Sequence, residues 1–124
     1  MKKLPEQFKK DWINALRSGK YAQVHQTLRG YFTDDEGNEL EDFGYCCLGV
    51  ACVVNRPEQE LDLGLDMPSE MLIDHEILDV FLQEVPKPNT VAGNDYEGLM
   101  FKLAAMNDGG KSFAEIADYI EENL

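Results

Sequence analysis

The chain has 124 residues, 44% of them hydrophobic and 28% charged, which predicts one globular domain, 1–124, with its own core and excludes a disordered chain. The formal net charge is −13, and a negative field repels phosphate groups, so we expect no direct binding to nucleic acid or to membrane surfaces. No apolar run is long enough to span a membrane and the first residues lack a secretory signal, so we expect a cytoplasmic protein.

The acidic residues are concentrated in the middle of the chain. Residues 1–29 contain seven basic and two acidic side chains, whereas residues 30–86 contain fifteen acidic ones and a single basic one, Arg56. Such a stretch would attract a basic protein partner through complementary charge. The alternative is that the acidity only keeps the protein soluble.

The first predicted element is a helix. Phe8, Trp12 and Leu16 recur at every fourth position after Pro5, a residue suited to a first helical turn. Ser18-Gly19 predicts its end. The helix is expected to pack on the core through this apolar face.

A β-hairpin is expected next. Residues 21–32 do not keep a helical period and predict a strand, an acidic turn rich in Asp, Asn and Gly follows, and the chain returns over residues 43–47. The spacing of the acids does not match a calcium-binding loop. We therefore predict a partner-binding surface at the acidic residues, which are Asp34, Asp35, Glu36, Glu39, Glu41 and Asp42.

Helices dominate the rest of the chain. The apolar run 48–54 predicts a short buried helix, residues 69–84 a helix that breaks near Asp74, and residues 98–106 another, with loops over 57–67 and 86–94. Ser112 and Glu115 form a capping box before a C-terminal helix. The predicted fold class is α+β, mostly helical, with four to five helices and one β-hairpin.

Three cysteines lie within seven residues. Adjacent Cys46 and Cys47 cannot readily face one metal ion, so we predict no zinc site and no other metal or cofactor. A nucleophilic cysteine would need a base, and His25 on the opposite strand is the candidate. Because the apolar residues after Cys47 predict burial, we expect inert thiols and no enzyme. A cysteine-dependent enzyme is kept as an alternative function.

Binding of a small molecule is another alternative function. The helix start at Gly110 and Ser112 offers free amides to an anion, although Gly109-Gly110-Lys111-Ser112 lacks the first glycine of a phosphate-binding loop. Together with the cysteine segment it would form a pocket for a nucleotide signal. The residues of this candidate site are Cys46, Cys47, Asn107, Asp108, Gly110 and Ser112.

Three segments of the chain form a pattern together: residues 12–21, Tyr45-Cys46-Cys47-Leu48-Gly49-Val50 and residues 106–118. They resemble segments of short, uncharacterised proteins of tailed phages and prophages, and the chain departs from that group over 34–42 and 57–96. The resemblance implies expression in a bacterial host and brings no activity with it. Because small phage proteins commonly modulate host machinery, our leading hypothesis is capture of a basic, nucleic-acid-handling host protein, for example inhibition of a defence protein by charge mimicry. Self-association as a homo-oligomer is left open.

Overall fold

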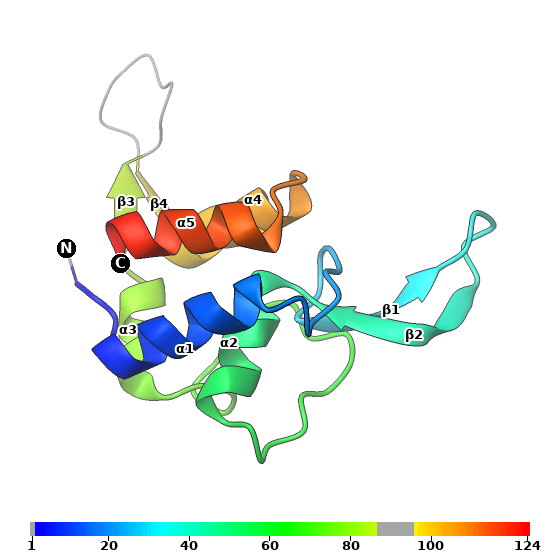
Figure 1. Ribbon diagram of the computed structural model, residues 1–124, viewed down its shortest axis with the longest axis horizontal. Coiled ribbons are helices and arrows are strands. Elements are labelled where there is room, and N and C mark those ends of the chain that lie inside the picture. The colour runs from blue at the N-terminus through cyan, green and yellow to red at the C-terminus, as the bar shows by residue number, and fades with distance from the viewer. Residues whose placement is uncertain (1, 87–95) are drawn as a thin grey trace.

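The computed structural model describes residues 2–86 and 96–124, which form five helices and two small antiparallel sheets (Figure 1). In chain order the elements are α1 (Glu6–Arg17), β1 (Arg29–Thr33), β2 (Glu39–Tyr45), α2 (Cys47–Asn55), α3 (His75–Phe81), β3 (Glu84–Pro86), β4 (Tyr96–Gly98), α4 (Leu99–Asp108) and α5 (Phe113–Asn123). The predicted α+β class, mostly helical with a β-hairpin, is confirmed. None of the described helices combines the length and apolar character needed to cross a membrane.

The helix α2 lies at the centre of the core. Its first six residues, 47–52, are all buried, as the apolar run predicted. The helix α1 packs against both α2 and α5, and the fully buried indole of Trp12 donates a hydrogen bond of 3.0 Å to the carbonyl of Cys47. The Trp12 ring also lies between Phe8 and Phe81, with centroids 5.6 and 5.4 Å away.

Close backbone contact joins α2 to the base of the hairpin. A Cβ atom at Gly49 would lie 1.9 Å from the carbonyl oxygen of Leu28, so only glycine permits this approach. The same carbonyl accepts a hydrogen bond of 3.1 Å from the amide of Cys46. Because Leu28 immediately precedes β1, the hairpin leaves the core from a fixed point.

The β1–β2 hairpin projects away from the helices (Figure 1). Its antiparallel register pairs Arg29 with Tyr45 and Tyr31 with Phe43, and a bulge follows Tyr31. At the tip the carboxylate of Asp34 accepts hydrogen bonds of 2.9 Å from the amides of Glu36 and Asn38. The acidic turn is therefore held by its own side chain.

The first strand is shorter than predicted. Residues 21–28 form a loop with one isolated bridge between Gln23 and Tyr45, and only residues from Arg29 onward are in β1. Gln26 has a φ of +70°, which is incompatible with a continuous strand. The return strand also differs from residues 43–47: β2 begins at Glu39 and ends at Tyr45, and Cys46 is the N-cap of α2.

Other boundaries differ as well. The helix expected over 69–84, with a break near Asp74, is wrong over most of that range. The only helix in it is α3, which begins after its N-cap Asp74 and ends at Phe81, and residues 69–73 before it are not helical. Residues 84–86 instead pair with β4 in a sheet that was not predicted. The expected turn at Asn107-Asp108 is the last turn of α4. Most of the predicted loop 86–94 lies outside the described residues.

Candidate functional site

The acidic hairpin, residues 29–45, carries the predicted partner-binding residues. All six acids are exposed: Asp34, Asp35, Glu36, Glu39, Glu41 and Asp42. The hydrogen bond from the Asn38 amide lowers the pKa of Asp34, so this carboxylate stays charged while it holds the turn. The hairpin therefore presents six negative charges in a short segment.

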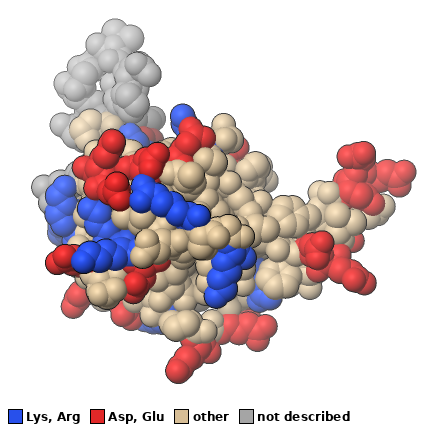
Figure 2. All heavy atoms as spheres, viewed as in Figure 1, with Lys and Arg blue, Asp and Glu red and all other residues tan. Residues whose placement is uncertain are grey.

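None of these six carboxylates makes an ion pair within residues 2–86 and 96–124. The basic N-terminal helix is paired elsewhere, because Arg17 lies 2.7 Å from Asp118 and 3.0 Å from Glu121 on α5. Figure 2 shows acidic side chains at the far end of the hairpin with no Lys or Arg beside them on this face. The charge of the hairpin is thus available to a partner.

The same hairpin exposes a row of aromatic side chains. The register places Tyr31, Phe43 and Tyr45 on one face, with ring centroids 6.3 and 6.0 Å apart along the row. Tyr31 and Phe43 are each 40% exposed. On the same face the Arg29 guanidinium lies 4.2 Å from the Phe43 centroid and donates a hydrogen bond to the Leu61 carbonyl. Sequence reasoning missed this face, although the alternation of Phe43 and Tyr45 along β2 was a signal for it.

The three thiols are buried, as predicted. Cys46, Cys47 and Cys52 have at most 5% of their surface exposed. Burial raises the pKa of all three, that of Cys47 well above its usual value and that of Cys52 to about 12. His25 is exposed and hydrogen-bonds to neither Cys46 nor Cys47. This arrangement favours inert thiols.

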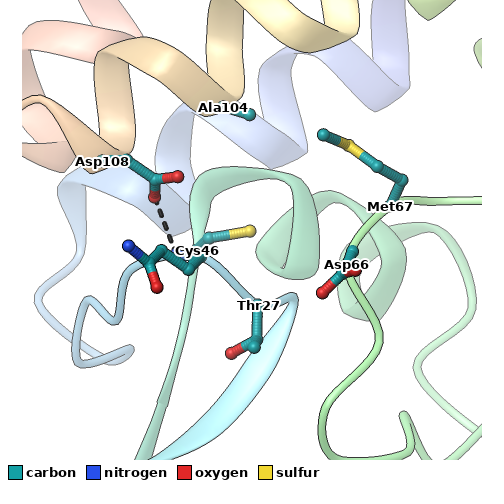
Figure 3. A pocket seen from close by; sticks show the side chains of 7 residues that line it. Thr27, Cys46, Asp66, Met67, Ala104 and Asp108 are labelled. Carbon is teal, nitrogen blue, oxygen red and sulfur yellow. Dashed lines mark hydrogen bonds between the residues drawn. The ribbon is translucent and has the colours of Figure 1, made fainter.

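A cavity of about 300 Å³ lies beside Cys46 (Figure 3). Of the six residues predicted for a small-molecule site, Cys46 and Asp108 line it, and Asp66 faces them from the 57–74 segment. Cys47 is buried behind it, with its thiol 3.6 Å from the Leu103 carbonyl. Carboxylates on both walls repel phosphate, so the cavity does not favour a nucleotide.

Gly110 and Ser112 do not line that cavity. The Ser112 hydroxyl accepts a hydrogen bond of 3.1 Å from the Glu115 amide, and the Glu115 carboxylate accepts one of 3.2 Å from the Ser112 amide. The predicted capping box is confirmed, and two of the polar groups expected to meet an anion are already paired. Within the described residues no cluster of three metal-ligating side chains occurs.

Asn107 has a structural position that the sequence did not reveal. Its fully buried amide accepts hydrogen bonds from Gln23 and from the Cys47 backbone, and donates to the Val24 carbonyl and to Asp108. Asp108 in turn accepts a bond of 2.8 Å from the amide of Gln26 (Figure 3). These two residues hold the 21–28 loop, and hence the cavity wall, against α2.

Comparison with known proteins gives a family but no activity. A family model described as a domain of unknown function, DUF8296, matches residues 4–124, so the chain belongs to this family. No curated protein and no solved structure matches it.

Proposed function

We propose that this protein binds a basic protein partner through its acidic hairpin, and that the partner is a nucleic-acid-handling protein of a bacterial host. The observation that carries the proposal is an anchored hairpin that projects six carboxylates, none of them in an ion pair within the described residues, next to exposed aromatic rings. The chain would act in the host cytoplasm as a phage-encoded inhibitor.

The carboxylates and the aromatic rings of the hairpin have different effects on binding. Unpaired surface charges accelerate encounter with an oppositely charged surface and select against acidic partners. Exposed aromatic side chains supply the buried contact area that usually dominates affinity. A narrow ribbon with carboxylates along it can enter a basic cleft that normally receives a phosphate backbone, which is the basis of charge mimicry.

The cavity beside Cys46 and the buried thiols support the alternatives less well. Asp66 and Asp108 oppose an anionic nucleotide. A cysteine-dependent reaction would require a thiolate, which burial of Cys46 and Cys47 disfavours. Protein binding through the hairpin is therefore the function with the strongest physical support.

Affinity capture from a bacterial host lysate tests the proposal. A tip-neutral variant combines Asp35→Asn, Glu36→Gln, Glu41→Gln and Asp42→Asn and keeps Asp34, which holds the turn. The control neutralises four exposed acids outside the hairpin that make no ion pair in the part of the chain that the structure describes: Glu58, Glu76, Glu84 and Glu122. The captured proteins are quantified at low and at high salt.

We expect the wild type and the control to capture a basic protein that elutes at high salt. The tip-neutral variant should capture at least roughly tenfold less of that protein. DNA should compete for the captured protein if its nucleic-acid site is the one occupied. Equal capture by the wild type, the tip-neutral variant and the control, or capture that does not change with salt, would contradict the proposal.

A further inference from the structure

A second surface lies on the body of the protein, outside the acidic hairpin. It is a groove of about 420 Å³ in the segment between α2 and α3, within the usual range of about 300–1,000 Å³ for binding clefts. Four apolar side chains and two acids are among the residues that line it: Leu65, Met67, Met71, Leu72, Glu60 and Asp62. We call this surface the methionine groove.

One of the apolar side chains that line the groove, Met71, is exposed to an unusual degree. Leu65, Met67 and Leu72 are half-buried and pack on the core with one side. Met71 is 79% exposed, the largest fraction among the exposed large hydrophobic residues of the described chain. Unbranched methionine side chains adapt to the shape of an apolar partner, and exposed clusters of them are typical of binding surfaces.

The backbone below Met71 is fixed while its side chain is free. The Met71 carbonyl accepts hydrogen bonds of 2.8 Å from Arg56 and 2.9 Å from Gln59. Arg56 also donates to the Glu70 carbonyl and pairs with Asp74 at 3.3 Å. The groove is therefore formed before any partner arrives, which lowers the entropic cost of binding.

The charge around the groove selects its occupant. Residues 57–72 contain five acids and no base, and the nearest base in sequence, Arg56, is already paired with Asp74. Glu60 lies 3.7 Å from Arg29, whereas Asp62 makes no ion pair within the described ranges. A groove lined by both apolar and acidic side chains is complementary to a segment that is apolar on one face and basic on the other.

We infer that the methionine groove binds a basic amphipathic helix of a partner protein. Apolar residues spaced three or four apart on that helix would contact Met67 and Met71, and its lysine or arginine residues would lie over Glu60 and Asp62. The inference goes beyond the hairpin proposal and does not depend on it, because the groove and the hairpin acids share no lining residue.

Binding of a synthetic peptide tests this inference. The probe is a fluorescent peptide of about fifteen leucine and lysine residues with leucine at helical spacing, and its control has the same composition in an order without an apolar face. Anisotropy is measured with the full chain at physiological salt. The variants are Met71→Gln, Met67→Gln/Met71→Gln, the tip-neutral hairpin variant and Leu82→Gln, which removes an exposed leucine outside the groove.

We expect the amphipathic peptide to bind at least roughly tenfold more tightly than the reordered one, with this preference lost in the double variant and reduced in Met71→Gln. It should persist in the tip-neutral and Leu82→Gln variants. Equal affinity of the two peptides, an unchanged preference in Met71→Gln, or loss in the tip-neutral variant would overturn the inference. Concentration-dependent dimers that disappear on Met71→Gln would assign the groove to a second copy and overturn it too.

Discussion

Asn107 joins three parts of the chain with one side chain. Its amide contacts the loop 21–28, the first residue of α2 and the end of α4, through four hydrogen bonds of 2.8 to 3.3 Å. A fully buried amide is costly unless every polar atom is paired, and here both are. The position of the loop before the hairpin therefore depends on this residue.

Replacement of Asn107 by alanine is expected to lower the free energy of unfolding by about 2–4 kcal/mol, because the Val24 carbonyl and the Cys47 amide lose their partner inside the protein. Urea unfolding measures the change. Asn123→Ala is the control, since the Asn123 side chain donates a single, part-buried hydrogen bond within the described residues, to the Tyr119 carbonyl. A cost no greater than that of the control would show that the network around Asn107 is not stabilising.

At single positions, local chemistry was predictable and distant contacts were not. The exposure of the acids from Asp34 to Asp42 follows from turn chemistry within a few residues. Asn107, in contrast, precedes Asp108-Gly109-Gly110, a pattern typical of turns, and nothing near it indicates a contact with Val24, 83 positions away. The predicted site residues Cys46 and Asp108 do line the same cavity, but the hydrogen bond from Asn107 to Val24 that helps to form its wall was not predicted.

The C-terminal helix α5 depends on its capping box. Ser112→Ala should lower the free energy of unfolding by about 1 kcal/mol, since the Glu115 amide loses its acceptor. Ser112→Asp, which keeps an acceptor at the N-cap, should restore most of the stability in the same thermal or urea measurement. Equal loss in both variants would mean that the cap does not stabilise α5.

The cap also predicts a pH dependence. The hydrogen bond from the Ser112 backbone lowers the pKa of Glu115 in the folded protein, so its contribution is present above the unfolded value and is lost as the pH falls through the folded one. Glu115→Gln should therefore be less stable than wild type at neutral pH, with the difference vanishing in acid. A difference that stays constant across this range would contradict the sign of the shift.

Elements with strong periodicity were predicted, and those fixed by long-range pairing were not. The apolar spacing of α1 and α5 and the apolar run of α2 determine these helices locally. The three-residue strands β3 and β4 exist only through their pairing with each other. The segment before α3 is held by Arg56, the C-cap of α2, and by Gln59 in the loop after it, so its non-helical path and the methionine groove had no local signal.

At the scale of the whole molecule, the acids of the hairpin and the basic residue Arg17 of α1 have different electrostatic surroundings. The basic residue Arg17 is paired with Asp118 and Glu121, which joins α1 to α5 at the two ends of the chain. The central acids of the hairpin are left without partners in the described structure and project from the body. This separation, rather than the net charge of −13, is what the proposed capture of a basic protein requires.

The most direct test is an amide NMR titration of the ¹⁵N-labelled protein with the basic protein that it captures. The account predicts that the largest shift changes fall on residues 29–45 and that they diminish together as salt is raised. Shift changes confined to the helical body, with the hairpin amides unchanged at saturation, would contradict the central claim that the acidic hairpin is the binding surface.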